Sequence, residues 1–470
     1  MYFRIKTHVA LRSWKGLRGA VYLKGQPYAR GVTAEELSVL KLCDGEHDIQ
    51  EDGTTAILIQ KDLIEPCRRG EHPSEWSAYR CYENRYFPKM NLMITGKCNY
   101  NCLHCFNAAD NAPLMTEWSY EELLNLLDQA KDCGIHALTI TGGEPMLHPR
   151  FMDFVAAVYE RGMFIEELNT NGAFIDQQKL DAFHRIGCDP LIKISFDGIG
   201  CHDWMRNRPG AEKKTLAAME LCIQNGFQVL SQTQVNRKNV HTLMDTARVL
   251  NEMGVSALRL IRTTETARWT KNAPDSSLSI QEYFAQMFDL ANAYRDSGMT
   301  MKLIIWQLMR MDPLYHTVSF DPIKSMDGTV KWTDPVCKGN RGMVAVTSSG
   351  EVIPCLQMSG YFEENGIHLG NLHQTPLKDF LNEGEYLDVV CTSLHQKLSS
   401  GSRCAACAYF KYCHGGCPAL GLLFTGSLNG EDPTKCVFFE QGWYQKALDF
   451  QKTYSGGRAL CADSCPDARV

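Results

Sequence analysis

Cysteine grouping constrains this chain more than any other feature of its sequence. The chain has 20 cysteines in 470 residues, and ten of them fall into two sets. The first set lies near residue 100 and the second in the last third of the chain: Cys98, Cys102 and Cys105, then Cys337, Cys355, Cys404, Cys407, Cys413, Cys417 and Cys436. The chain is too long for a small disulfide-stapled protein, and its first residues, MYFRIKTHVALRSWKG, lack the apolar core of a secretory signal. We therefore expect a reducing, cytoplasmic location, where grouped cysteines are more often metal ligands than disulfides.

Composition excludes several classes of protein. The chain has 44% hydrophobic and 22% charged residues, as ordinary soluble globular proteins do, so collagen-like and disordered classes are excluded. Its net charge of −6 gives no bulk attraction to nucleic acid, and no apolar run is long enough to cross a bilayer. At roughly 150 residues per domain, the length predicts about three domains.

The middle of the chain alternates between strand and helix patterns. Six apolar runs predict strands, and the clearest helix between them begins with the capping box of Ser119 and Glu122. The strands are expected at 90–94, 137–140, 164–168, 191–196, 227–232 and 257–261, and the helices at 119–133, 150–161, 176–186, 211–225 and 240–253. Alternation of this kind forms a parallel sheet, and six units are too few for a closed eight-stranded barrel. We predict an α/β fold with a partial (β/α)6 TIM barrel, whose functional loops follow the carboxyl ends of the strands.

The first 88 residues predict a separate, small α+β unit. Val21–Tyr28 has the pattern of a strand, and Thr33 with Glu36 forms a capping box that begins a helix ending near Gly45. A further apolar segment follows at 56–64, and residues 71–76 have the composition of a linker.

The pattern Cys98-x3-Cys102-x2-Cys105 directly follows the first predicted barrel strand. Three thiolates at this spacing can converge on one metal centre. A structural zinc ion takes four ligands and a simple ferredoxin cluster takes four cysteines, so three cysteines leave one iron of a cluster open. The alternatives are three core cysteines or part of a zinc site.

Polar segments close the next three predicted strands. Thr141–Pro145 follows the second strand; its glycines let the backbone approach a ligand, and Glu144 offers an acceptor to a ligand amine. Asn169–Gly172 follows the third strand and Ser195–Gly198 the fourth. Each alone is an ordinary strand-to-helix turn, but together with the three cysteines they predict one site at the carboxyl edge of the sheet.

This order of motifs resembles the radical SAM superfamily, and the resemblance covers about 90–310. It implies a [4Fe–4S] cluster on the catalytic cysteines Cys98, Cys102 and Cys105, whose open iron would chelate the amino and carboxylate groups of S-adenosylmethionine. One-electron reduction would then release a 5′-deoxyadenosyl radical. The resemblance also implies a set of cofactor-binding residues: Gly142, Gly143, Glu144, Pro145, Asn171, Ser195, Asp197 and Arg262. Arg259 is a further candidate beside Arg262, and for both arginines the alternative is a surface charge.

The seven C-terminal cysteines follow the pattern Cys337-x12-Gly350-x4-Cys355, Cys404-x2-Cys407-x5-Cys413-x3-Cys417 and Cys436. Such spacings indicate zinc or iron–sulfur sites, and seven thiolates do not divide into two four-ligand sites. The pattern resembles the SPASM domain, which implies two auxiliary [4Fe–4S] clusters and hence three in all. One would lie on Cys404, Cys407, Cys413 and Cys436, and the other on Cys337, Cys355 and Cys417.

The second auxiliary cluster would lack a fourth cysteine. Some members of the family supply it a few residues upstream, where this chain has Lys331–Val336 and no cysteine. The position could be filled by a substrate thiolate, by a distant Cys461, Cys465 or histidine, or by water or a solvent thiol. Open metal positions tend to be functional, which favours the substrate thiolate.

Residues 33–50, after the paired strands, resemble the RiPP recognition element, a small domain that binds leader segments of ribosomally made peptides as an added strand. An unrelated helical cap or a dimerisation unit is the alternative. The resemblance implies a precursor peptide as partner, with its leader on residues 1–88, and an electron donor such as flavodoxin or ferredoxin.

These patterns predict five segments: a leader-binding unit with linker (1–88), the radical SAM barrel (89–310), a bridge (311–335), the SPASM domain (336–445) and a C-terminal helix and tail (446–470). We predict an oxidoreductase that abstracts hydrogen from a precursor peptide and forms a thioether, as sactipeptide and ranthipeptide maturases do. The alternatives are carbon–carbon or carbon–oxygen crosslinking, epimerisation, formylglycine formation as in sulfatase-type maturases, a non-catalytic leader-binding scaffold and a redox carrier.

Overall fold

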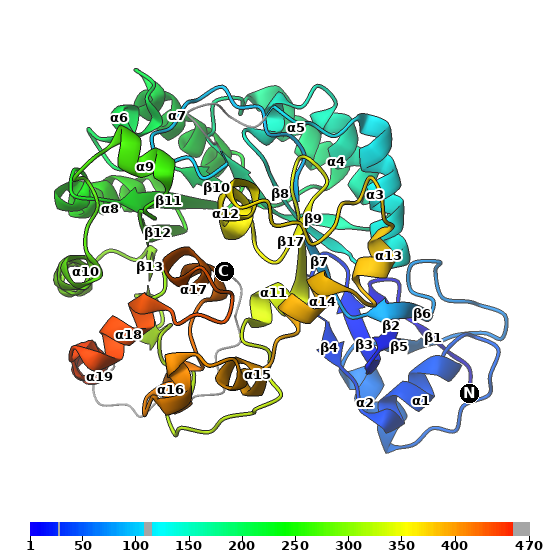
Figure 1. Cartoon of the computed structure of the whole chain (residues 1–470). Coiled ribbons are helices and arrows are strands. Elements are labelled where there is room, and N and C mark those ends of the chain that lie inside the picture. The colour runs from blue at the N-terminus through cyan, green and yellow to red at the C-terminus, as the bar shows by residue number, and fades with distance from the viewer. Residues whose placement is uncertain (27–28, 108–114, 455–470) are drawn as a thin grey trace.

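The computed structural model describes residues 1–26, 29–107 and 115–454. Figure 1 shows an arc of strands covered by helices, an N-terminal unit beside one end of the arc, and the C-terminal third between the two ends. No helix in the described residues is long and apolar enough to cross a membrane.

The arc is a sheet of parallel strands in sequence order. The first six are the predicted ones, β7 (Lys89–Met93), β8 (Ala137–Thr141), β9 (Phe164–Thr170), β10 (Leu191–Ser195), β11 (Val229–Val235) and β12 (Ala257–Arg262). A further parallel strand, β13 (Lys302–Ile305), was not predicted. The expected α/β class and partial barrel are confirmed.

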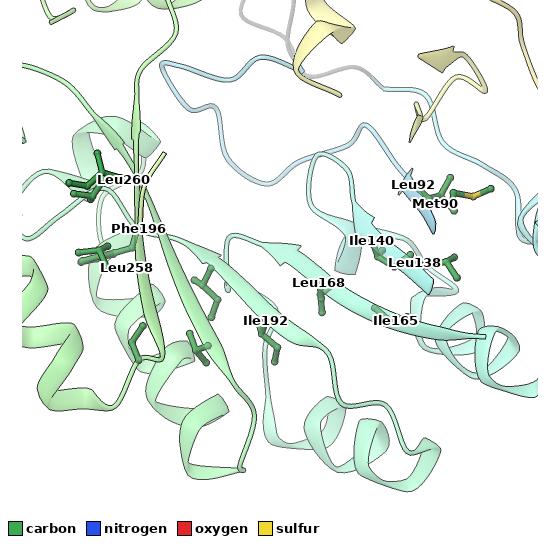
Figure 2. Packing of buried hydrophobic residues seen from close by; sticks show 14 of the residues in the cluster. Met90, Leu92, Leu138, Ile140, Ile165, Leu168, Ile192, Phe196, Leu258 and Leu260 are labelled. Carbon is green, nitrogen blue, oxygen red and sulfur yellow. The ribbon is translucent and has the colours of Figure 1, made fainter. Parts of the chain in front are cut away.

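Helices cover the outer face of this sheet. The five predicted helices are α3 (Tyr120–Asp132), α4 (Phe151–Glu160), α5 (Gln177–Ile186), α7 (Ala211–Gln224) and α8 (Leu243–Met253). The capping box of Ser119 and Glu122 is present at the start of α3. Sequence patterns missed α6 (His202–Arg206), α9 (Ala267–Asn272) and α10 (Ile280–Arg295). Buried side chains on alternate strand positions, such as Leu138, Ile192 and Leu258, point toward these helices and form the core (Figure 2).

The sheet continues beyond both edges of the barrel. A hairpin of β14 (Met309–Asp312) and β15 (Thr317–Phe320) extends it past β13. At the other edge, β16 (Met343–Val346) pairs in parallel with β7, and β17 (Val352–Ile353) pairs with β16. The C-terminal third is therefore joined by backbone hydrogen bonds to the strand that precedes the first cysteine group.

The N-terminal unit has two small sheets and two helices. The pair β1 (Phe3–Ile5) and β5 (Ile64–Pro66) forms one sheet; β2 (Val9–Lys15), β3 (Leu17–Leu23), β4 (Arg30–Gly31) and β6 (Arg80–Arg85) form the other. The Thr33 capping box begins α1 (Ala34–Leu42) as expected. The strand expected at 21–28 lies earlier, at β3, and residues 27–28 are outside the described residues. The apolar segment at 56–64 divides between α2 (Gly53–Gln60), capped by Asp52, and β5.

Short helices form the rest of the C-terminal third. They are α11 (Lys338–Gly342), α12 (Ser359–Glu364), α13 (Leu377–Phe380), α14 (Glu385–Val390), α15 (Leu394–Ser399), α16 (Phe410–Cys413), α17 (Pro418–Thr425), α18 (Pro433–Glu440) and α19 (Trp443–Tyr454). The tail that contains Cys461 and Cys465, two candidates for the missing ligand, lies outside the described residues.

Candidate active site and cysteine groups

The first cysteine group lies on the loop that follows β7. The amide of Tyr100 donates to Cys98 Sγ over 3.5 Å, and the amide of Cys105 donates to Cys102 O over 3.3 Å. Burial raises the pKa of Cys98 to about 12 and that of Cys105 to about 11. Thiols in such surroundings ionise only beside positive charge, from a metal or from cationic side chains.

The two glycines after β8 allow close contact with this cysteine loop. A Cβ at Gly142 would lie 2.3 Å from Thr95 O, and one at Gly143 would lie 2.2 Å from Lys97 O. The amides of Gly143 and Glu144 donate to these same carbonyls, over 2.7 and 2.9 Å. In the structure the glycines admit the backbone of the cysteine loop, and their expected close approach to a ligand stays a prediction.

Glu144 connects the loop after β8 to the end of β9. Its fully buried carboxylate accepts from Thr170 Oγ1 and from the amide of Asn171, each over 2.8 Å, and from the amide of Met146 over 3.3 Å. Burial raises the pKa of Glu144 to about 7, although these hydrogen bonds act in the opposite direction. Glu144 thus accepts from three protein donors, and its expected role as acceptor for a ligand amine stays a prediction. Pro145 begins the short turn of 3-10 helix at 145–147.

Asn171 links β9 directly to the cysteine loop. Its side-chain nitrogen donates to Oδ1 of Asn99 over 2.8 Å, and Asn99 lies between Cys98 and Cys102 in the sequence. The Glu144 and Asn171 contacts together hold the loops after β7, β8 and β9 against one another, as the order of motifs predicted.

Asp197, after β10, faces a buried arginine. Its carboxylate is fully buried, lies 2.7 Å from Arg206 Nε and accepts from the amide of Gln234 over 3.0 Å. Burial alone would raise the pKa of Asp197, but the charge of Arg206 and the contact with His202 outweigh burial and lower the pKa below its usual value. In the structure Asp197 holds Arg206, and its expected contact with the cofactor stays a prediction.

Arg206 carries positive charge to the cysteine loop, and sequence reasoning missed it. Its Nη1 lies 3.6 Å from Cys102 Sγ, and the amide of Leu103 donates to Met205 O next to it. Arg268 of α9, also missed, donates through Nε to Cys102 O over 3.0 Å. Each arginine follows a strand end by several residues on a short helix, and neither has a sequence signal beyond its charge.

The remaining expected cofactor residues lie on two faces of the sheet. Ser195 is level with Gln232 of β11 at the carboxyl end of β10. Arg262 donates to Leu278 O over 2.7 Å and pairs with Glu265, so it is anchored beside α10. Arg259 instead stacks on Trp306, with 3.8 Å from the guanidinium carbon to the ring centroid.

Four cysteines of the second set line one cavity of about 390 Å³. They are the four that the resemblance assigned to one auxiliary cluster: Cys404, Cys407, Cys413 and Cys436. Tyr409, Phe410 and Phe439 supply apolar walls, and Arg403 and Lys435 supply positive charge. Four thiols that line one cavity are the donor set that a [4Fe–4S] cluster requires, so these residues fit that group.

The other three cysteines also lie near one another. Burial raises the pKa of Cys417 to about 12 and that of Cys355 to about 11, and the charge of Cys337 adds to both shifts. Beside them is a second cavity of about 490 Å³, lined by Cys337, Asn340, Asn429 and the residues next to the other two cysteines.

Asp432 connects the two groups. It accepts from the amide of Cys417 over 2.9 Å, and it lines the four-cysteine cavity. The buried Lys397 donates to Gly430 O over 2.8 Å beside it. Asp432 and Lys397 therefore place buried charges of both signs next to the thiols.

No group of three or more His, Cys, Asp or Glu side chains in the described part of the chain could hold a metal ion. In a [4Fe–4S] cluster each cysteine ligates an iron of its own, so the thiols need not converge on a single ion.

Two family models match the chain. One is described as the radical SAM superfamily and covers residues 92–250. The other is described as an iron–sulfur cluster-binding domain, SPASM, and covers residues 337–408. The chain contains a radical SAM domain and a SPASM domain. The candidate site at the strand ends of β7 to β10 falls within the first, and the four-cysteine cavity begins in the second.

Curated relatives of this radical SAM/SPASM protein have different activities. An AdoMet-dependent heme synthase from Nitratidesulfovibrio vulgaris is 26% identical over 347 residues, which cover 72% of this chain and 89% of that protein. The antilisterial bacteriocin subtilosin biosynthesis protein AlbA of Bacillus subtilis is 21% identical over 407 residues, which cover 85% of this chain and 82% of that protein.

Solved structures share the fold. SuiB of Streptococcus suis bound to S-adenosylmethionine covers 92% of this chain and 99% of its own, with a TM-score of 0.63 at 14% identity. SuiB bound to its precursor peptide SuiA gives a TM-score of 0.64 at 13% identity, with the same coverage. Together with this likeness in fold, the two family models confirm the expected radical SAM core and C-terminal SPASM domain.

Proposed function

We propose that this chain is a radical S-adenosylmethionine enzyme that modifies a ribosomally made peptide and joins a cysteine sulfur to a carbon atom. The observation that carries the proposal is the arrangement at the first cysteine group. Three loops from β7, β8 and β9 and the Asp197–Arg206 pair meet at Cys98, Cys102 and Cys105.

The three cysteines would hold a [4Fe–4S] cluster, and the protein's own residues would prepare that site. Arg206 would place positive charge beside the Cys102 thiolate, because Asp197 fixes it and burial keeps water away. Gly142 and Gly143 would keep the second loop in contact with the first. The bound cluster and S-adenosylmethionine would supply a 5′-deoxyadenosyl radical.

The atoms and electrons of thioether formation are all accounted for by the groups proposed here. The substrate C–H bond would give its hydrogen atom to the 5′-deoxyadenosyl radical, and the substrate S–H would lose a proton. The new S–C bond releases one electron, which an auxiliary cluster would accept. We propose that Cys337, Cys355 and Cys417 hold that cluster, with the substrate thiolate as its fourth ligand. The second cavity beside these cysteines would be the place where the substrate thiol enters.

A peptide substrate is supported by the similarity to AlbA, named for bacteriocin biosynthesis, over most of both chains. It is also supported by the likeness in fold to SuiB, which has been solved with a precursor peptide. We propose that residues 1–88 bind the leader of that peptide and that a flavodoxin or ferredoxin supplies electrons.

A second candidate is an enzyme of haem synthesis. The observation that favours it is the heme synthase relative, which has the higher identity and 89% of its length covered. The two candidates differ in whether the substrate is a peptide or a tetrapyrrole.

The test is the mass of a small peptide from a neighbouring reading frame, co-expressed anaerobically with the chain and then alkylated at its thiols. Loss of two hydrogens together with a lost alkylation site is the expected result. Loss of two hydrogens with free thiols indicates a carbon–carbon or carbon–oxygen bond instead, and deuterium uptake from heavy water without another mass change indicates epimerisation. A one-residue oxidation to formylglycine or an unmodified peptide would overturn the proposal. The Cys98→Ala/Cys102→Ala/Cys105→Ala variant is the matched inactive control.

A further inference from the structure

The inner face of the barrel sheet carries charged side chains, whereas its outer face is apolar. Along β12, Leu258 and Leu260 belong to the core under the helices, and Figure 2 shows both side chains. Side chains alternate along a strand, so Arg259 between them points to the inner face. In register with it are Gln232 of β11 and Ile304 of β13. The guanidinium therefore lies within the arc of strands.

Arg259 and Trp306 form a stacked pair on this face. The guanidinium carbon lies 3.8 Å from the centre of the indole ring, which is a cation–π distance. Both residues are partly exposed, but Arg259 Nε and Trp306 Nε1 are buried and have no hydrogen-bond partner within the described ranges. Buried donors without an acceptor are rare in proteins, so the lack of an internal acceptor here requires an explanation.

Neighbouring cations on the sheet have carboxylates of their own. Lys193 donates to Glu167 over 2.6 Å, and Arg310 pairs with Asp321 over 3.1 Å. Arg259 makes no ion pair with any described residue; Glu167 is close enough to attract it but already holds Lys193. Burial lowers the pKa of Arg259 to about 10, which leaves it charged at neutral pH. Within the described residues, Arg259 is thus an inner-face cation without an ion-pair partner of its own.

We propose that Arg259, supported by Trp306, binds a carboxylate group of the substrate. This inference rests on the proposed function, because it assigns the carboxylate to the modified peptide. Its source is either an acidic side chain or the C-terminal carboxylate of the peptide. A guanidinium presents two parallel N–H donors to the two oxygens of a carboxylate, and stacking on an indole fixes the plane of that fork. The bound group would supply the missing counter-charge and orient the peptide in the barrel.

The test uses defined probes and the full chain, with its clusters reconstituted. N-acetyl-L-glutamic acid N′-methylamide represents a side-chain carboxylate, and N-acetylglycylglycine represents a C-terminal one. N-acetyl-L-glutamine N′-methylamide is the uncharged match. Dissociation constants are measured by saturation-transfer NMR titration. One acid should bind at least about tenfold more tightly than the amide, and which acid binds identifies the source.

Arg259→Gln should abolish this preference, and Arg259→Lys should weaken acid binding about tenfold, because an ammonium cannot form the two-pronged contact. Arg248→Gln removes an exposed cation on α8 and is the matched control, with unchanged binding expected. Equal affinity of the wild type for acids and amide, or undiminished acid binding by both Arg259 variants, would overturn the proposal. If Arg259→Gln does not fold, as iron content and circular dichroism would show, the Arg259→Lys result decides.

The outcome is separable from that of the proposed function. If no peptide is modified but acid binding depends on Arg259, the carboxylate site stands and the identity of the substrate changes. If a peptide is modified and no acid binds, the carboxylate site alone is wrong.

Discussion

Breaking the Asp197–Arg206 pair should strongly destabilise the barrel. The two side chains are 0% and 8% exposed, and Arg206 Nε lies 2.7 Å from Asp197 Oδ2. At an effective dielectric of about 20, two charges at such separations attract each other by about 4–6 kcal/mol. Removal of one partner leaves the other charge buried and unpaired, which costs about 3–5 kcal/mol. We therefore expect Arg206→Met and Asp197→Asn each to lower the free energy of unfolding by that amount.

The double variant distinguishes pairing from simple loss of packing. With both charges gone, the cost of the unpaired charge disappears, so the double variant should lose at least about 2 kcal/mol less than the sum of the singles. Urea denaturation of the cluster-free protein, followed by circular dichroism, gives the free energy of unfolding of the wild type, both single variants and the double variant. Asp245 and Arg248, an exposed pair 2.5 Å apart on α8, are the matched control and should show no measurable coupling. Additive losses at Asp197 and Arg206 would refute the reasoning.

Three further changes test other parts of the site. Gly143→Ala should lower the free energy of unfolding, measured by urea denaturation, by about 2 kcal/mol or more, because the added Cβ would lie 2.2 Å from Lys97 O. Gly53→Ala is the control and should be neutral or stabilising, because nothing lies within 4 Å of its added Cβ. Equal effects of the two substitutions would contradict this prediction. The pKa of Glu144 is raised to about 7 in the folded protein, so folded Glu144 keeps a proton that the unfolded chain releases from about pH 4.5 upward. The contribution of Glu144 to the free energy of unfolding should therefore fall by on the order of 3 kcal/mol as the pH rises from about 4.5 to about 7. Glu144→Gln should remove that fall, as urea denaturation of cluster-free protein at pH 5 and pH 8 would show, and parallel pH dependences would contradict it. Cys404→Ala should lower the iron content by about four atoms per chain in a colorimetric assay, whereas the exposed Cys81→Ala should not, and an unchanged content in both would count against a cluster in the cavity.

The sequence predicted those elements whose signals are local. The Ser119 and Thr33 capping boxes lie within four residues, and both form as expected. The six barrel strands have apolar outer faces, which their residue patterns show directly. The seventh strand, β13, was missed although Leu303 and Ile305 are buried, because it lies after a long helix and outside the six repeated units.

The candidate site was predicted as a set of residues but not as a set of contacts. Glu144 and Asp197 belong to motifs that are readable from the sequence, yet both carboxylates are held by protein donors in the structure. Their partners Asn171 and Arg206 come from other loops, and no local pattern states which charge faces which. Arg206 could not have been found in advance, because its role depends on a distance to Cys102 that only the fold determines.

The pairing of β16 with β7 has a consequence for synthesis of the chain. Met90 and Val344 are neighbours in this sheet, although translation separates them by more than half of the protein. Until residues 343–346 leave the ribosome, β7 has one bare edge, and bare strand edges invite pairing with other chains. A nascent chain that stops before that point would therefore expose the strand beside Cys98 to aggregation. The first cysteine loop therefore gains the support of β16 only after residues 343–346 have been synthesised.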